Sequence, residues 1–89
     1  MNYVYALECY INNKKIFYIG KTKDLRKRVK RHLSGDIKST KKFSKIKLVY
    51  YEACLDKNDA AKRELALKTG FGRGYLNRRL KSYLTKKRP

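Results

Sequence analysis

Four side chains in the first part of this chain could together form a polar site. Tyr5 and Tyr18 lie in two separate apolar runs, and Arg28 and His32 follow one helical turn apart in a basic stretch. A phenol and an imidazole can hold and transfer protons, and the forked donors of a guanidinium suit two phosphate oxygens. Because the chain carries a net charge of +18, we expect this group of side chains to face phosphate.

The excess of basic residues runs through most of the chain. Its 89 residues include 25 Lys and Arg but only 7 Asp and Glu, and the basic ones are spread from Lys14 to Arg88. Such a charge favours a polyanionic partner through counterion release. Solubility is the alternative explanation, but it needs far less charge. Hydrophobic residues form 42% of the sequence, enough for one small domain with a single core.

Membrane insertion and secretion are not indicated. No stretch approaches the roughly 18 apolar residues of a membrane span, and no signal peptide opens the chain. Cys9 and Cys54 lie in apolar runs without metal-ligand spacing, so we expect buried, reduced thiols. His32 is the only histidine, which argues against structural zinc. A cytoplasmic location follows, with association to the nucleoid if the protein is bacterial.

Three segments are expected to be strands. Residues 3–9 and 15–19 are rich in aromatic and apolar side chains, and the Asn-containing turn between them predicts an antiparallel hairpin. Gly20 is expected to end the hairpin, where it would serve the backbone turn. Residues 46–54 predict a third strand, and residues 36–45 before it form a polar, basic loop.

A basic helix is expected directly after the hairpin. Asp24 or Thr22 can cap it, and it runs to about Leu33, where residues 34–35 end it.

This helix has an apolar stripe with polar residues beside it. Leu25, Val29 and Leu33 have the spacing of an inward stripe, and Arg28 and His32 lie one residue off it. We therefore expect Arg28 and His32 at the edge of the buried face rather than on the solvent side.

Two more helices are expected in the second half of the chain. The first covers residues 57–68 with Asp56 or Asn58 as its cap, and the second covers residues 73–84, with a break at residues 69–72 between them. In the first of these helices Ala60, Ala61, Leu65 and Lys68 recur at helical spacing, and in the second Tyr75, Leu76, Leu80 and Tyr83 are expected to point inward.

This order of elements predicts an α/β fold. A small central three-stranded antiparallel sheet flanked by three helices accommodates it within one domain of residues 1–84. Residues 85–89 are expected to form a basic tail.

An ordered set of motifs resembles the GIY-YIG nuclease superfamily. The set consists of Tyr3-Val4-Tyr5, then Tyr18-Ile19-Gly20, then Arg28, then Glu64 on a later helix. Small single-domain members, similar to the N-terminal incision domain of the bacterial excinuclease, look closest, since residues 38–40, 48–52 and 67–73 also have the look of that group. The first motif lacks its glycine and isoleucine but keeps its last tyrosine as Tyr5. Asn77 stands near a position where several members carry an asparagine, and no role is carried over to it.

The resemblance implies a divalent metal, Mg²⁺ or Mn²⁺, held by one carboxylate. Glu64 is the residue expected to bind the metal. This agrees with the usual coordination of Mg²⁺ by one or two protein carboxylates. The alternative is a surface glutamate that pairs with Lys68 at i+4.

The same resemblance implies roles for three more residues, and the imidazole of His32 adds a fourth candidate by its own chemistry. Tyr5 and Tyr18 are candidates for activating water, and which of them is the base stays open; the alternative is that both fill the core. Arg28 would stabilise charge on the phosphate, unless it is one more solvated arginine. His32 would hold a phosphate oxygen or carry a proton, or else it packs near the helix end.

Other basic residues are expected to hold the nucleic-acid backbone. Contacts of this kind grip phosphates and carry little sequence information. The candidates are Lys21, Lys23, Lys38, Lys41, Lys42, Arg73, Arg78 and Arg79.

The function predicted from these residues is a metal-dependent endonuclease that hydrolyses DNA phosphodiester bonds. The DNA could be branched or damaged, RNA stays open as a partner, and the chain would act as a monomer or transient dimer, with a protein partner for targeting left open. The alternatives are a non-cleaving nucleic-acid-binding module of the same fold and a basic RNA-associated protein. A role in DNA repair is one setting for the nuclease.

Overall fold

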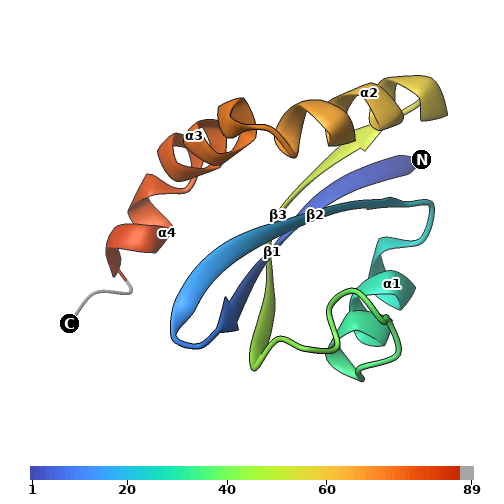
Figure 1. Cartoon of the computed structure of the whole chain (residues 1–89). Helices are drawn as coiled ribbons and strands as arrows, with labels where there is room; N and C mark the ends of the chain where they lie inside the picture. Colours follow the sequence, from blue (N-terminus) through green and yellow to red (C-terminus); the bar gives the residue numbers. More distant parts are fainter. Residues whose placement is uncertain (87–89) are drawn as a thin grey trace.

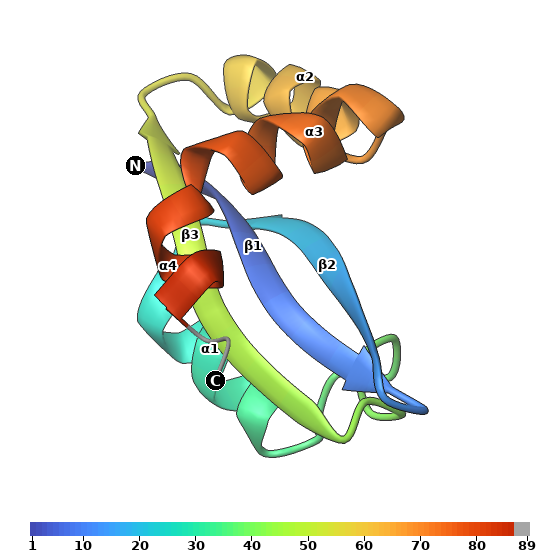
Figure 2. The same ribbon diagram turned by 90° about the vertical axis from the view of Figure 1, so that its left-hand side faces the viewer.

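The computed structural model describes residues 1–86 and contains one three-stranded antiparallel sheet with four helices. The strands are β1 (Asn2–Ile11), β2 (Lys14–Thr22) and β3 (Lys45–Cys54), in the spatial order β2-β1-β3. The helices are α1 (Leu25–Leu33), α2 (Lys57–Leu67), α3 (Gly70–Arg79) and α4 (Lys81–Lys86). Figures 1 and 2 show α1 on one side of the sheet and α2 and α3 on the other. The predicted α/β class and antiparallel sheet are confirmed.

The hairpin forms as predicted, and two asparagines make its turn. Ile11 pairs with Lys14, and the two residues between them, Asn12 and Asn13, have φ angles of 52° and 65°. A two-residue turn with both central residues in the left-handed region matches the twist of the flanking strands, and asparagine tolerates this region better than most residues. The turn therefore fixes the register that places Tyr5 opposite Gly20.

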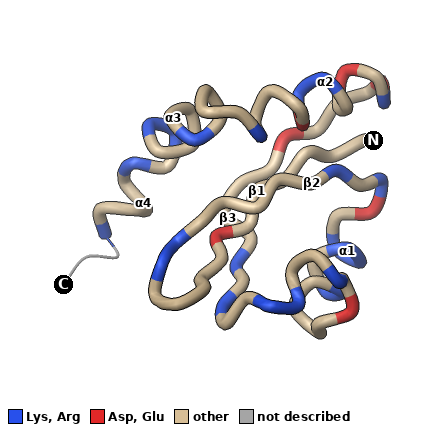
Figure 3. The backbone as a smooth tube through the Cα atoms, in the orientation of Figure 1, with Lys and Arg blue, Asp and Glu red and all other residues tan. Residues whose placement is uncertain are grey.

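Charge is distributed unequally among the elements. Lys and Arg occur on each of the four helices, whereas the central strand β1 carries none (Figure 3). The basic surface therefore belongs to the layers outside β1.

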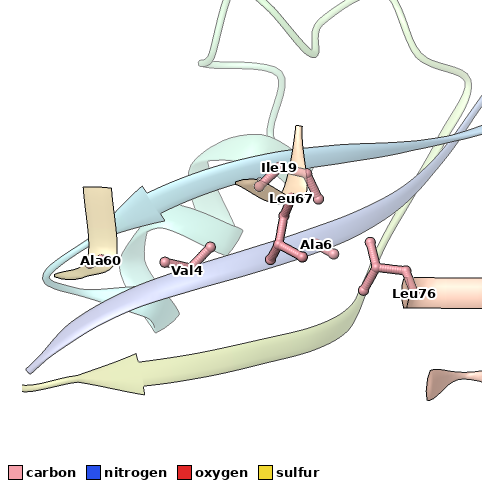
Figure 4. Close-up of a cluster of buried hydrophobic side chains, with 6 residues drawn as sticks. All are labelled: Val4, Ala6, Ile19, Ala60, Leu67 and Leu76. Carbon is pink, nitrogen blue, oxygen red and sulfur yellow. The ribbon is translucent and has the colours of Figure 1, made fainter. Parts of the chain in front are cut away.

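Each face of the sheet has its own core. On the α2 and α3 side, Val4, Ala6 and Ile19 of the sheet pack with helix residues, of which Leu67 and Leu76 are buried (Figure 4). On the α1 side, the buried residues are Tyr5, Leu7 and Cys9, and Tyr18, Leu25, Phe43, Ile46 and Leu48 pack against them. Alternation along β1 thus sends neighbouring residues to different cores, and Tyr5 faces α1.

The C-terminal helices differ from the prediction. A single helix over residues 73–84 was expected, but α3 begins at Gly70 and ends at Arg79, and α4 then runs to Lys86. Glycines at 70 and 72 read as a break, yet both lie within α3. A β-carbon at Gly72 would overlap the backbone of Leu67, so this glycine permits the close α2–α3 junction. Thr85 and Lys86 belong to α4 rather than to a tail, and residues 87–89 lie outside the described part.

Two leucines are exposed where the helical spacing favoured burial. Leu33 is 60% exposed. At about 100° per residue, Leu33 lies about 80° around the helix axis from Leu25, whereas His32 lies only about 20° from Leu25. His32 therefore takes the inward position expected for Leu33. Leu65 is 65% exposed, while Ala60 and Leu67 are buried. The sheet-facing stripe of α2 therefore follows positions 60, 63, 64 and 67, and its two middle positions are the charged Arg63 and Glu64.

The caps of α1 and α2 are those expected from the sequence. The side chain of Asp24 accepts a hydrogen bond from the backbone N of Lys27, and that of Asp56 accepts one from Asn58. The two cysteines are free: Cys9 is buried, which raises its pKa to about 11, and Cys54 is half-buried. Within residues 1–86, no helix is long and apolar enough to cross a membrane.

Candidate functional site

Tyr5, Tyr18 and His32 come together on the α1 side of the sheet. Tyr5 on β1 is only 2% exposed, and Tyr18 lies on the neighbouring strand β2. The His32 ring, from α1, is held edge-on to both phenols, with its centroid 5.6 Å from that of Tyr5 and 5.4 Å from that of Tyr18. His32 is itself 1% exposed. It is therefore at the centre of this cluster, further inside than the edge position expected from the sequence.

Gly20 serves the Tyr5 side chain rather than a turn. It lies inside β2, which continues to Thr22, and it is the cross-strand partner of Tyr5. A β-carbon at this position would overlap the ring and hydroxyl of Tyr5. The absence of a side chain thus lets the Tyr5 phenol lie across β2. The expectation that Gly20 ends the hairpin is wrong for this reason.

A chain of hydrogen bonds leads from Tyr5 through His32 to Thr40. The hydroxyl of Thr40 donates to the carbonyl of Ile37 at 3.4 Å, which leaves its oxygen to accept from Nδ1 of His32 at 2.8 Å. In the tautomer with the proton on Nδ1, Nε2 of His32 carries a lone pair and accepts the proton of the Tyr5 hydroxyl, 2.7 Å away. Thr40 is fully buried, so no water competes for its hydroxyl. This arrangement makes His32 a proton acceptor toward Tyr5.

Tyr18 has a polar partner of its own. Its hydroxyl lies 2.8 Å from Oγ of Ser39, the residue directly before Thr40. The loop between α1 and β3 therefore contacts both the tyrosine of β2 and the histidine of α1. Sequence reasoning assigned no role to Ser39 and Thr40, because a single hydroxyl in a basic loop has no periodic signal.

Burial keeps Tyr5 and His32 neutral. Burial raises the pKa of Tyr5 to about 12; the charge of Arg28 lowers it, and Tyr18 and Glu64 raise it. Burial also lowers the pKa of His32 below 6.5, and the charges of Arg28 and Arg31 act in the same direction. Arg28 thus influences both groups, and it is half-buried rather than solvated like Arg26.

Glu64 approaches from the other layer of the fold. It lies on the sheet-facing stripe of α2, and its side chain is only 16% exposed. Its carboxylate is 3.5 Å from Nζ of Lys68, which is the i+4 pair considered from the sequence. The negative charge of Glu64 also contributes, as the smallest of four causes, to the raised pKa of Tyr5. The structure thus contains the ion pair considered from the sequence, and the role of Glu64 as a metal ligand stays a prediction.

The donor set fits a metal that uses few protein ligands. No group of three or more His, Cys, Asp or Glu side chains among residues 1–86 is arranged to hold a metal ion. A partly buried single carboxylate suits Mg²⁺, which keeps several waters and takes further oxygens from a phosphate. Glu64 is the described residue that could hold such an ion.

A hollow lies between β2 and the helices α2 and α3. Its volume is about 560 Å³, and Tyr18 lines it together with Lys68 and Arg73. Asn77, which stands near the asparagine position of the resemblance, lines the same hollow. Tyr18, which packs with the core on the α1 side, thus also borders a hollow next to α2 and α3.

The predicted nucleic-acid contacts are exposed but lie on three separate segments. Lys21 and Lys23 flank the end of β2, and the three predicted lysines of the next segment lie in the loop after α1. Arg73, Arg78 and Arg79 are on α3. Arg73 lines the hollow with Tyr18, which the spacing in sequence did not indicate.

A second polar cluster holds α2 and α3 on β3. Arg63 donates from Nε and Nη2 to the carboxylate of Glu52 at 2.9–3.0 Å, and the Tyr50 hydroxyl donates to the same carboxylate at 2.9 Å. The Tyr50 and Tyr75 hydroxyls are 2.8 Å apart, and the guanidinium lies over the Tyr75 ring. Arg63 directly precedes Glu64, so this cluster anchors α2 to β3 next to the candidate metal ligand. Sequence reasoning missed it.

Comparisons with known proteins place these residues in a family. A family model described as the GIY-YIG catalytic domain matches residues 1–77. The UPF0213 protein CPE1444 of Clostridium perfringens is 41% identical over 69 residues, which cover 76% of this chain and 71% of that protein. The UPF0213 protein SSP2268 of Staphylococcus saprophyticus is 36% identical over 69 residues, covering 76% of this chain and 80% of that one.

A solved structure is also similar. The solution NMR structure of the UPF0213 protein BH0048 from Bacillus halodurans is 34% identical, with a TM-score of 0.46, over 99% of this chain and 86% of that one. The family match spans Tyr5, Tyr18, Arg28, His32 and Glu64. This chain belongs to the GIY-YIG nuclease superfamily, and within it to the small UPF0213-like members.

Proposed function

We propose that this protein is a metal-dependent endonuclease that hydrolyses phosphodiester bonds in DNA. The observation that carries the proposal is the oriented hydrogen-bond chain from Tyr5 through His32 to Thr40, with Arg28 beside it. A buried tyrosine with a dedicated proton acceptor is more than a core residue needs, since a phenylalanine would fill the same space. Membership in a nuclease superfamily supports the same conclusion.

The Tyr5–His32 pair would activate the attacking water. A phenol with a pKa of about 12 is a poor base alone, but its proton can pass to Nε2 of His32, 2.7 Å away, as the water gives its proton to the Tyr5 oxygen. The resulting hydroxide attacks phosphorus, and the bond to the leaving sugar oxygen breaks; that oxygen takes a proton from solvent. The negative phosphate offsets the repulsion between Arg28 and a protonated His32.

Arg28 and Glu64 would act on the phosphate from two sides. The guanidinium can donate to two phosphate oxygens and stabilise the charge that builds up on them. Glu64 would hold a divalent cation, which when bound supplies further charge neutralisation at the phosphate. Tyr18, held by Ser39 at 2.8 Å, would position the water or a phosphate oxygen.

The second candidate function is a nucleic-acid-binding module that does not cleave. The Glu64–Lys68 ion pair favours it, because a carboxylate already paired with an ammonium binds a metal less readily. Lys68 is 51% exposed on its side chain, so the pair can open without disturbing the core.

One assay separates the two functions. The pure protein is incubated with supercoiled plasmid, branched DNA and structured RNA, each with Mg²⁺, Mn²⁺ or EDTA. We expect metal-dependent cleavage of DNA that is lost in Arg28→Ala and Glu64→Gln. Binding of every substrate without cleavage would support the non-cleaving module.

Matched variants on the same helices control for charge and folding. Lys27→Ala removes an exposed cation of α1, and Asp59→Ala removes an exposed carboxylate of α2. Both are expected to cleave like the unmodified protein. Cleavage unaffected by Arg28→Ala and Glu64→Gln would refute the site.

A further inference from the structure

A second cleft lies on the same face of the sheet as Tyr5 but on the other flank of α1. Arg28 and His32 occupy one flank of this helix, and Arg26 and Lys30 occupy the other, since two residues correspond to about 200° of rotation. The cleft has a volume of about 630 Å³ and lies between the start of α1 and β3. It is therefore separate from the hollow at the β2 edge that Tyr18 lines.

Two aromatic rings form one wall of this cleft. Tyr3 of β1 and Tyr51 of β3 are in edge-to-face contact, with ring centroids 6.0 Å apart and an angle of 67° between the planes. Tyr51 is the cross-strand partner of Tyr5, so its side chain points to the same face of the sheet. It is 54% exposed although α1 lies nearby. Tyr51 thus offers an oriented, solvent-facing ring.

The opposite wall of the cleft is cationic. Lys23, Arg26 and Lys30 all line it, and all three are exposed. Asp24 is the single carboxylate among the lining residues, and it accepts the backbone N–H of Lys27 at 3.1 Å as the cap of α1. Three cations against one carboxylate leave this wall strongly positive beside the aromatic ring.

This combination matches the chemistry of an unpaired nucleotide. Single-stranded nucleic acids are held by aromatic side chains that stack on bases and by cations that follow the phosphates. A base within a duplex has no free face for such stacking, so the cleft would distinguish unpaired from paired strands. We infer that this cleft binds an unpaired nucleotide of single-stranded DNA, with its base on Tyr51 and its phosphates on Arg26 and Lys30.

The inference deepens the proposed function, because it rests on DNA being the partner of this domain. A duplex near Arg28 and an unpaired strand in this cleft would lie on opposite flanks of α1. The protein would therefore prefer DNA in which a duplex meets a single-stranded arm. The proposed cleavage chemistry alone does not define which shape of DNA is preferred, and the cleft would define it.

Fluorescence anisotropy tests the cleft without requiring cleavage. The probes are labelled oligothymidylate, oligouridylate, a blunt duplex and the same duplex with a single-stranded arm, all in EDTA. The unmodified protein should bind the armed duplex more tightly than the blunt one. Tyr51→Ala should weaken binding to oligothymidylate and the armed duplex by roughly tenfold and leave the blunt duplex within about twofold.

Two more variants keep the test independent of folding. Tyr51→Phe retains the ring and should bind like the unmodified protein. Arg26→Glu changes only an exposed side chain and should weaken binding to the armed duplex at least as much as Tyr51→Ala does. Phe71→Ala is the matched control, since Phe71 is 55% exposed on α3, outside this cleft, and should leave the arm preference unchanged.

The outcomes distinguish the cleft from the proposed function. Equal losses on armed and blunt duplexes, or the same loss in Phe71→Ala, would overturn the cleft. If the protein cleaves blunt duplex with metal but does not bind oligothymidylate, the cleft proposal is also overturned. The proposed nuclease activity is then still supported. Tighter, Tyr51-dependent binding of oligouridylate would reject DNA as its ligand. Failure to bind or cleave any probe would overturn both.

Discussion

The hydroxyl of Tyr5 and Nε2 of His32 form a hydrogen bond of 2.7 Å between the central strand and the first helix. Both residues are almost completely buried, and the second nitrogen of the same imidazole is held by Thr40. Loss of any one of the three groups leaves a buried polar atom without its partner. This arrangement therefore makes stability and proton transfer depend on the same hydrogen bonds.

Thr40→Val is expected to lower stability and change proton placement. Valine keeps the shape of threonine but leaves Nδ1–H of His32 without an acceptor, which costs about 1–3 kcal/mol of the free energy of unfolding. The imidazole then loses the contact that selects its tautomer, so cleavage should fall more than DNA binding does. Urea unfolding and imidazole ¹⁵N shifts measure the two effects. Ser34→Ala, which removes an exposed hydroxyl, is the control; unchanged imidazole shifts in Thr40→Val would contradict the assignment.

Gly20→Ala is expected to destabilise the protein by about 1–3 kcal/mol, because the added methyl group overlaps the Tyr5 ring. Urea unfolding measures this loss. The same change in a Tyr5→Leu background should cost clearly less, since the overlapping ring is then absent. Gly70→Ala is the matched control, as no atom beyond its chain neighbours and the adjacent backbone of its own helix lies within 4 Å of the added carbon. Equal stability of Gly20→Ala and the unmodified protein would show that Tyr5 does not lie across β2.

The stability of the protein should decrease in mild acid because of His32. Its folded-state pKa is lowered by burial, by Arg28 and by Arg31, whereas the unfolded chain titrates near 6.5. As the pH falls below 6.5, the unfolded chain takes up the proton first, so stability present above this value is lost as the pH falls toward the folded-state pKa. His32→Gln should lose less stability between about pH 7 and about pH 5. If the free energy of unfolding depends on pH in the same way in both proteins, His32 is not the cause of the loss of stability in acid.

Arg63→Lys is expected to destabilise the α2–β3 contact although the charge is kept. A lysine cannot make the two-pronged interaction with Glu52 or lie flat on Tyr75, and hydrogen bonds to charged groups are worth about 1.5–3 kcal/mol. If the cluster also sets the rotation of α2, metal-dependent cleavage should decline while binding of DNA is retained. A double-mutant cycle with Glu52→Gln measures the coupling. If the losses in free energy of unfolding from the two changes simply add, Arg63 and Glu52 are not coupled energetically.

The sequence predicted the elements whose signal is local and periodic. The hairpin follows from two apolar runs around Asn12 and Asn13, and α1 follows from the Asp24 cap and the stop at residues 34–35. The junction at Gly70 was missed because glycine reads as a break, and only the packed structure shows that Gly72 touches Leu67.

The polar parts of the site were harder to predict. The stripe of α2 was obscured because charged residues, Arg63 and Glu64, occupy its middle positions. Ser39 and Thr40 contributed to the family resemblance, but their hydrogen bonds were not predicted, since their partners are 21 and 8 residues distant in the sequence. Tyr51 was assigned to a strand, and its exposure depends on how α1 meets β3, which only the tertiary structure defines.

The separation of Tyr5 and Glu64 into opposite layers has a consequence during synthesis. Residues 1–40 supply the phenol, the imidazole and its threonine, but the carboxylate enters only when α2 has docked on the far side of the sheet. A nascent or partly unfolded chain with α2 detached would hold the proton-accepting half of the site without the half proposed to bind metal. The proposed cleavage of nucleic acids would therefore begin only after α2 has docked and the fold is complete.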